Sequence, residues 1–412
     1  MKFFSTLFIA FLTVTTVFAQ VPTNGLVAYY SFDDCTGFDF SGQGSNGTLF
    51  GDSCAICGVS GQAFFFNGQF AMTGGPANYM LALNQVNNIF DLNDFSVSFY
   101  MKSTNGQGNK DILSKREGCN DDNAFAIRFL PATNSIAVDL SENASKSAPV
   151  SAPLDFGHCW QHIVFVRQNT RSSLYINGTL RAESSAGSRV DISNNAVLSI
   201  ANSPCQSTTE VPFAGVLDEM RFYDRALAVS EIESLYFGPD KIVNNDLTVF
   251  LGESVDLEST MSCANNFLWQ PSDFLLSDDT PTTTSTPTSS ITYTLNFTED
   301  NVCIAFDTVR ITVIDPADLN CEEVYLPKAF TPNDDGLNDT YGISNPYAVL
   351  DLISLEIFDR WGARVFFTDE PFGRWNGEFK NDPVNPGVML YKVRFRCNGE
   401  EKVDVGSLSI IR

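Results

Sequence analysis

Apolar and polar residues alternate in short runs along most of the chain. In residues 95–101, 125–129 and 136–140 every second residue is Phe, Ile, Val, Leu or Met. A period of two is typical of β-strands that bury one face. Residues 160–167 are apolar at both parities, which predicts a strand covered on both sides. Because helical periodicity is almost absent, the pattern predicts an all-β protein built from two-sheet sandwiches.

Two local patterns predict how strands are joined. Asn177-Gly178 lies between apolar residues, which favours a two-residue hairpin turn. After a last strand within residues 215–227, Ser230 and Glu233 have the spacing of a capping box, so we expect a short helix to begin at Ser230.

The alternating pattern is interrupted at residues 238–245 and 315–320, which we interpret as linkers. Between them, the Thr-rich stretch 278–290 is either a flexible or O-glycosylated stalk or a loop inside a domain. We favour the loop because a strand pattern and a cysteine follow it. We therefore expect a leader at 1–19 and domains at 20–240, 241–316 and 317–412.

The N-terminus has the layout of a secretory signal peptide. Lys2 precedes an apolar segment, and Ala19 precedes Gln20 at the cleavage point we expect. The apolar segment is shorter than the roughly 20 residues of a spanning helix, so we expect no transmembrane segment once the signal peptide is removed. Ten cysteines in an exported chain indicate disulfides and an oxidising, extracellular compartment.

Composition narrows the function classes. The 412 residues are 43% hydrophobic and 18% charged, as in globular proteins. The 25 basic and 49 acidic residues give a net charge of −24, which repels nucleic acid, so we expect no nucleic-acid partner.

The cysteines fall into the three expected domains. We expect Cys263 to pair with Cys303 and Cys321 with Cys397, because each pair lies alone within its domain. A redox or zinc role for Cys54-x-x-Cys57 is disfavoured because the chain has neither a βαβ pattern nor a second such motif. The six remaining cysteines are expected to form three bridges in an order that stays open: Cys35, Cys54, Cys57, Cys119, Cys159 and Cys205.

Residues 25–237 carry the segments GLVAYYSFDD, DFSGQGSNGT, WQHIVFVR, LYINGTL and LDEMRFYDRALAVSEIESLY in this order. This set resembles the laminin-G-like, concanavalin A-like jelly roll of secreted bacterial proteins, which implies a jelly-roll sandwich. The resemblance also implies a structural calcium site, with Asp39, Asn46 and Asp218 as candidate ligands. In the middle domain, Cys263, Trp269 and Cys303 are similar to the core of an immunoglobulin-like sandwich, so we expect an Ig-like or PKD-like spacer.

Asp218 shares its strand parity with Val216, Met220 and Phe222, which turns it toward an apolar face. A buried carboxylate needs a cation or several hydrogen-bond donors. Two interpretations stay open: calcium, which suits oxygen ligands on turns, or backbone donors from the loop at residues 39–48.

The last 90 or so residues carry five further segments in order: LPKAFTPNDDGLND, IFDRWG, FGRWNGEF, PGVMLYKV and GSLSIIR. They resemble the gliding-motility-associated C-terminal domain, the type B sorting domain of secreted Bacteroidetes proteins. This resemblance implies the type IX secretion machinery as a partner and an extracellular or outer-membrane surface location. The motif residues are Asn333, Asp335, Gly336, Asp339, Arg360, Trp361 and Gly362.

The acidic turn of that domain permits two interpretations. Asn333, Asp335 and Asp339 alternate as in a calcium loop, but no closing Glu follows. We favour a turn stabilised by its own Asx hydrogen bonds.

Jelly rolls of this kind also include glycoside hydrolases, which need two carboxylates roughly 5 to 9 Å apart. Asp218 and Glu219 are the nearest acidic pair, but neighbours on a strand point to opposite faces. His158 and His162 flank a strand, where a packed or surface histidine is favoured over a metal ligand. The sequence therefore predicts a secreted, non-enzymatic binding protein, an adhesin or a carbohydrate- or protein-binding module for an extracellular glycan or protein ligand. The alternatives are a divergent hydrolase and a structural surface or matrix component.

Overall fold

The computed structural model describes residues 21–51, 57–69, 77–104, 106–120, 122–207, 209–299, 303–333, 337–380 and 382–411. The expected signal peptide at 1–19, Cys54, Asp335 and Gly336 lie outside these residues. No helix within the described ranges is long and apolar enough to cross a membrane. The chain forms two compact units: Met1–Asp246, Asp256–Ser285 and Thr292–Arg310 make up unit 1, and Leu247–Val255, Thr286–Ile291 and Ile311–Arg412 make up unit 2.

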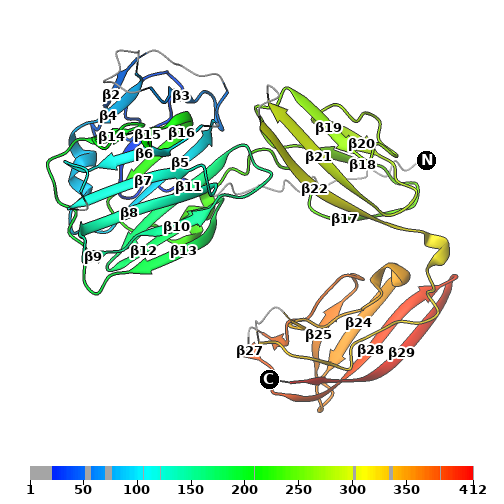
Figure 1. The fold of residues 1–412 in the computed structure, drawn as a ribbon. Coiled ribbons are helices and arrows are strands. Elements are labelled where there is room, and N and C mark those ends of the chain that lie inside the picture. The colour runs from blue at the N-terminus through cyan, green and yellow to red at the C-terminus, as the bar shows by residue number, and fades with distance from the viewer. Residues whose placement is uncertain are drawn as a thin grey trace, which may run out of the picture. The chain divides into compact units, whose positions relative to one another are not determined.

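Unit 1 is dominated by a sandwich of two β-sheets (Figure 1). The first sheet has the order β1 (Leu26–Tyr30), β16 (Ala214–Tyr223), β5 (Phe95–Ser103), β11 (Gln161–Gln168), β12 (Arg171–Ile176) and β13 (Thr179–Ser185), with β3 (Phe64–Asn67) also on β16. The second has the order β10 (Val150–Pro153), β8 (Ser135–Asn143), β7 (Ala124–Leu130), β6 (Asn109–Lys115), β14 (Leu198–Ile200), β4 (Tyr79–Ala82) and β2 (Gly47–Phe50). Strands β15 (Glu210–Pro212) and β9 (Lys146–Ser147) extend it on β6 and β8. The predicted all-β fold is confirmed.

The core lies between these two sheets and follows the predicted alternation. Phe95, Val97, Phe99 and Met101 of β5 all belong to the buried cluster. Strand β11 is buried on both faces, as expected: Phe165 enters this core, whereas its neighbours on the strand pack under the helix described next.

The short helix α1 (Val229–Ser234) begins one residue earlier than expected, and its cap is a different one. The Oε2 atom of Glu231 accepts the backbone N–H of Ala228 at 2.9 Å, so the capping box predicted at Ser230 and Glu233 is wrong. Arg225 holds the Glu231 carboxylate in place at 2.6 Å, a contact that local spacing does not reveal. Ile232 then packs on the outer face of the first sheet.

The remaining strands of unit 1 form a smaller part: β18 (Val255–Glu258) pairs with β20 (Thr282–Ser285), and β19 (Asn266–Gln270) with β21 (Ile291–Glu299). Trp269 is fully buried, and its Nε1 donates to the Thr280 carbonyl at 2.9 Å. Residues 278–285 of the Thr-rich stretch therefore belong to unit 1 and include β20, whereas residues 286–290 belong to unit 2. The stretch is thus part of the folded chain, as the loop interpretation predicts. Strand β22 (Cys303–Ile314) begins in this unit and continues into unit 2.

Unit 2 contains β17 (Leu247–Phe250), parallel to the end of β22, and a sheet of order β23 (Ala329–Phe330), β29 (Glu400–Ile410), β28 (Gly387–Cys397), β24 (Leu352–Phe358) and β25 (Arg364–Thr368). A short pair, β26 (Glu378–Phe379) and β27 (Asp382–Pro383), accompanies it. Phe330 and Trp375, from two of the C-terminal sequence segments, meet in its core with ring centroids 5.5 Å apart. Cys321 and Cys397 form a disulfide, the pairing that the sequence predicts.

The predicted Cys263–Cys303 bridge is wrong. Cys263 is bonded to Cys57 with a Cα–Cα distance of 5.6 Å, and Cys303 to Cys159 with 5.8 Å. The sandwich and the smaller set of strands pack within one unit, so cysteines from different expected domains become neighbours. Cys119 pairs with Cys205, Cys35 is also disulfide-bonded, and the described part of the chain has no free cysteine.

Non-reducing peptide mapping tests this bridge pattern. We expect linked peptides that join Cys57 to Cys263 and Cys159 to Cys303. A reduced and alkylated digest, in which these linked masses vanish, is the matched control. Recovery of a peptide that links Cys263 to Cys303 would contradict the structure.

Candidate functional site

A β-bulge in β16 decides where the acidic pair lies. Asp218 is opposite Tyr100 and Arg221 opposite Ser98, so β16 carries one extra residue there, and Glu219 takes a φ of +52°. Leu217 and Met220 both enter the core, because the extra residue reverses the parity of the strand. The prediction that Asp218 shares a face with Met220 and Phe222 is therefore wrong.

Asp218 is fully buried on the outer side of the sheet and accepts three backbone N–H groups. Its Oδ2 accepts from Val59 at 2.7 Å and from Ser60 at 3.3 Å, and its Oδ1 from Glu219 at 2.8 Å. These donors come from a different segment than the predicted loop at residues 39–48. A Cβ atom at Gly58 would lie 2.5 Å from Oδ2, so this close approach requires glycine. Burial is the main cause that raises the pKa of Asp218 to about 8, and the negative charge of Glu219 is the second. The three hydrogen bonds favour the ionised form and only partly offset this rise.

Glu219 is also buried and fully engaged. Its carboxylate accepts the Tyr29 hydroxyl at 2.8 Å and forms an ion pair with Arg221, whose guanidinium lies 4.1 Å from the Tyr29 ring centroid. The expectation that neighbouring residues point to opposite faces thus fails at this bulge. Neither carboxylate faces solvent, so the pair is not placed to flank a substrate.

Asp39 organises the loop at residues 39–48. Its two carboxylate oxygens accept the backbone N–H groups of Tyr29, Ser41 and Ser45 at 2.9–3.0 Å, and Asn46 Oδ1 accepts the N–H of Asp39 at 2.9 Å. Burial opposes ionisation, but these hydrogen bonds outweigh it and hold the pKa of Asp39 below its usual value. Asp39 and Asn46 lie together, whereas Asp218 is bonded to residues 59–60. Calcium at these residues stays a prediction.

His162 is fully buried in β11 and stacks on Tyr100 with ring centroids 4.5 Å apart. Its Nε2 lies 2.9 Å from the Ser98 hydroxyl, and burial together with Arg221 lowers its pKa to about 3. His162 is thus a packed neutral histidine. His158, by contrast, is half-buried and lines a groove.

This groove is an open cleft of about 690 Å³ in unit 1. It is lined by the ends of β5 and β7, the start of β11 and the loop at residues 154–159. Glu299 and Cys303 of the smaller set of strands complete the lining. The groove therefore lies where several strands of both sheets begin or end, where loops can supply ligand contacts.

The predicted Asn177-Gly178 turn supports one wall of the groove. Both residues have positive φ (50° and 77°), as a two-residue hairpin between β12 and β13 requires. Asn177 Nδ2 donates to Asp155 Oδ2 and Gln161 Oε1, each at 3.0 Å. Gln161 Nε2 in turn donates to the Asp155 carbonyl at 2.9 Å, and Arg181 pairs with the Asp155 carboxylate at 2.6 Å. The hairpin thereby fixes the loop at residues 154–159.

The other charges of the groove are also paired. Lys102 forms an ion pair with Glu299, and its ammonium lies 4.8 Å from the centroid of the buried Trp160 ring. Burial, and next Lys241, lower the pKa of His158, so its imidazole is neutral at pH 7. Within the described residues, the side chains of Gln107, Asn134 and His158 make no hydrogen bond or ion pair, and apolar Phe129, Pro131 and Leu154 lie in the same lining. The groove offers neutral polar groups on an apolar wall.

Sequence reasoning did not find these groove residues. Gln107, Asn134 and Asp155 come from loops far apart in the chain, and no motif marks them. The sequence feature that could have pointed to them is the Asn177-Gly178 turn, because the Asn177 side chain donates a hydrogen bond to Asp155.

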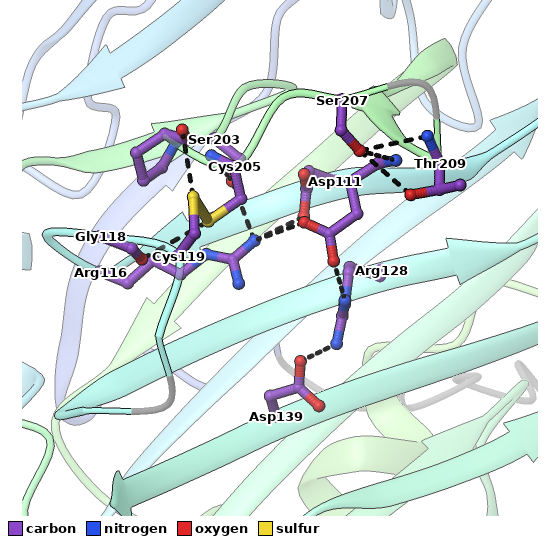
Figure 2. Close-up of polar contacts among 12 residues, drawn as sticks. Asp111, Arg116, Gly118, Cys119, Arg128, Asp139, Ser203, Cys205, Ser207 and Thr209 are labelled. Atoms are coloured by element: carbon purple, nitrogen blue, oxygen red, sulfur yellow. Dashed lines mark hydrogen bonds and ion pairs between the residues drawn. A yellow bond between two sulfur atoms is a disulfide. The ribbon is translucent and has the colours of Figure 1, made fainter.

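A second polar cluster lies on the second sheet, beside the Cys119–Cys205 bridge (Figure 2). Asp111 is fully buried and accepts Arg116 Nη2 at 3.2 Å, and the same nitrogen donates to Ser203 Oγ at 2.9 Å. Burial raises the pKa of Asp111 to about 6 against the attraction of Arg116.

Arg128 extends this cluster along the sheet by pairing with Glu210 at 2.9 Å and with Asp139 (Figure 2 shows the Asp139 contact). Both arginines of the cluster are thus neutralised by carboxylates. The cluster ties β6, β7, β8 and β15 together and leaves no guanidinium for a ligand.

A second groove, of about 750 Å³, lies at the opposite ends of β5, β11 and β16. It is more polar, and its two arginines are already bound: Arg225 to Glu231 at 2.6 Å and Arg189 to Asp94 at 3.0 Å. We therefore regard the first groove as the candidate site.

The motif residues of unit 2 form two turns. Asn333 donates its backbone N–H to Asp339 at 3.0 Å, a contact across the acidic turn whose centre lies outside the described residues. At the β24–β25 turn, Gly362 has a φ of +84°, and Trp361 is 85% exposed with the Arg360 guanidinium 5.9 Å from its ring centroid. The Asp335–Gly336 part of the motif stays a prediction.

Two family models match the chain. Residues 74–233 match the concanavalin A-like lectin/glucanases superfamily, and residues 324–410 match the CHU_C type IX secretion signal domain. The chain carries both domains. The type IX secretion signal domain implies handling by the type IX secretion machinery and export to the cell surface or the extracellular space.

Three solved structures are similar to parts or most of the chain. Domain 4 of AbnA, a GH43 extracellular arabinanase from Geobacillus stearothermophilus, is 21% identical, with 51% of this chain and 98% of that chain covered and a TM-score of 0.37. The CBM40 of Ruminococcus gnavus IT-sialidase is 16% identical, with 46% and 96% covered and a TM-score of 0.33. The binding domain of botulinum neurotoxin DC is 11% identical, with 95% of each chain covered and a TM-score of 0.43. These likenesses are too distant to inform on the ligand, and no curated protein matches the chain.

Asp39 provides a test that separates backbone hydrogen bonding from calcium binding. We expect Asp39→Ala to lower the free energy of unfolding by about 2–4 kcal/mol, because three backbone donors lose a charged acceptor. Urea unfolding of wild type and variant should give the same difference in calcium and in chelator. If chelator alone destabilises the wild type by a similar amount, Asp39 binds a cation instead.

His162 makes stability depend on acid. Its pKa of about 3 in the folded state lies below that of an unfolded histidine. The unfolded chain therefore binds a proton first as the pH falls from about 6.5 toward 3, and stability is lost over that window by up to about 1.4 kcal/mol per pH unit. We expect the melting temperature of His162→Phe, which keeps the ring stacking, to fall less steeply than that of wild type between pH 6.5 and 4. Parallel curves would contradict this assignment.

Proposed function

We propose that the chain is a secreted, non-enzymatic binding protein whose concanavalin A-like domain binds a neutral glycan in the 690 Å³ groove. The main support is the electrostatics of that groove. Among the described residues of the lining, Lys102 is paired with Glu299 and Asp155 with Arg181, so neither pair needs a counter-charge on the ligand.

The chemistry of the unpaired groups matches sugar hydroxyls. The amides of Gln107 and Asn134 each donate and accept hydrogen bonds, as a hydroxyl does. Leu154, Phe129 and Pro131 give the apolar wall on which the C–H face of a sugar ring can pack. The net charge of −24 repels acidic polysaccharides that approach the surface.

A hydrolase needs two carboxylates free to act on one bond. Among the described residues that line this groove, the acids are Asp155 and Glu299, and each is held by a cation. This pairing supports binding without cleavage.

Binding of the secreted chain to a panel of neutral and acidic polysaccharides, measured by calorimetry, tests the proposal. We expect saturable binding of a neutral glycan, weakened about tenfold in Asn134→Ala and in Gln107→Ala, since each loses a hydrogen bond of about 1.4 kcal/mol. Asn88→Ala, an exposed amide at the second groove, is the matched control and should bind as wild type.

Three results would count against it: no neutral glycan binds, both groove variants bind as wild type, or reducing ends are released during incubation. Because burial holds the pKa of His158 below its usual value, the affinity should stay constant between pH 7 and 8.5.

A further inference from the structure

The β28–β29 hairpin leaves one edge of the unit 2 sheet open. Its turn, Asn398-Gly399, has positive φ at both residues (53° and 84°), and Cys397 is opposite Glu400 directly after it. Such a two-residue turn closes on a hydrogen-bonded pair, and these pairs then recur at every second residue. On β29, Glu400, Lys402, Asp404, Gly406 and Leu408 therefore bond to β28.

The backbone groups of the alternate residues point to the other side. Strand β23 uses the end of this edge: Ser409 N–H donates to the Lys328 carbonyl at 2.9 Å and Ile411 N–H to Phe330 at 3.1 Å. Because β23 is only two residues long, residues 401–407 have no strand beside them among the described residues. The backbone N–H and C=O groups of four alternate residues therefore point away from β28 and form an open hydrogen-bonding edge. These residues are Glu401, Val403, Val405 and Ser407.

The side chains beside this ladder are apolar and exposed. Val403 is 54% and Val405 66% exposed, and on β28 Val388 and Leu390 are 59% and 53% exposed on the same face. Exposed edges of native sheets are usually blunted by proline, by a bulge or by a covering segment. Between residues 401 and 407 this edge has no proline and no bulge, and charged residues flank its valines. Residues 322–325 line a pocket together with Lys402, Val403 and Asp404, and Glu322 pairs with Lys402, but among the described residues no backbone hydrogen bond joins that segment to residues 401–407.

We propose that residues 401–407 of β29 are a docking edge to which the type IX secretion machinery adds an extended strand with apolar residues at alternate positions. The match of residues 324–410 to the secretion signal domain places this edge in the part of the chain that the machinery handles. The same edge already accepts a strand, β23, so its geometry suits continued strand addition. A second copy of this chain is the weaker occupant, because two copies each carry a net charge of −24.

Export of the full chain from a bacterium with type IX secretion tests this edge. Val403→Pro and Val405→Pro each remove an outward N–H without removing a bond to β28. We expect each to reduce the fraction of chain at the cell surface and in the medium at least tenfold, with the chain retained in the periplasm. Val403→Thr and Val405→Thr, which keep the N–H and the branched shape, are the matched controls and should be exported within twofold of wild type.

Export of both proline variants at the wild-type level would overturn the proposal. Equal loss in the threonine variants would also overturn it, since the apolar face and not the backbone edge would then be recognised. Wild-type dimers in solution that are absent from the proline variants would assign the edge to a second copy instead.

A measurement on the wild-type chain covers the case in which a proline variant fails to fold. We expect hydrogen exchange of the Val403, Val405 and Ser407 amides to slow at least tenfold on adding outer membranes from secretion-competent cells. Membranes from cells lacking the secretion machinery should leave the rates unchanged. Unchanged rates with both membranes would contradict the docking edge.

Discussion

Two disulfides determine the shape of unit 1 at its candidate site. Cys57–Cys263 and Cys159–Cys303 join loops of the large sandwich to the smaller set of strands across 206 and 144 residues of chain. In the chain-entropy model each such closure contributes about 5 kcal/mol. The loop at residues 154–159, which walls the groove, is held in addition by a hydrogen bond of 3.0 Å from Phe306 N–H to the Gly157 carbonyl. Loops that form binding sites are otherwise the mobile part of a domain, so here covalent bonds set the groove, and they require the oxidising compartment to which the secretion signal leads.

Charge is handled locally in this acidic protein. Asp39 and Asp218 are each satisfied by three backbone donors, and Glu219 by Arg221 and Tyr29. The buried Asp111 is paired with Arg116. The surplus negative charge therefore resides on exposed side chains, where water screens it. In the part of the groove that the structure describes, Lys102 and Asp155 are likewise paired, although the chain has a net charge of −24.

The bulge at Asp218 and Glu219 shows how one backbone residue changes the chemistry of a strand. Without it, the two carboxylates would lie on opposite faces of β16. With it, Leu217 and Met220 both reach the core, and the two acids lie on the outer side, where residues 59–60 and Arg221 meet them. The parity rule holds along β5, where Phe95, Val97, Phe99 and Met101 all enter the core, and it fails at register shifts such as this one and the one in β6, where Ile112 and Leu113 are both buried in the core.

Features that depend on neighbours along the chain could be predicted from the residues alone. The alternation of apolar residues predicted strands β5 and β8, and Asn177-Gly178 predicted the hairpin turn. The ordered C-terminal segments predicted the secretion signal domain. The folded chain was needed to learn how the cysteines of unit 1 pair, which face Asp218 takes and which side chains line the groove. These features arise where segments separated by 100 residues or more meet, as Cys57 meets Cys263 and Asp218 meets Val59. Local periodicity does not predict such tertiary contacts, because it indicates which face of a strand is buried but not which segment covers that face.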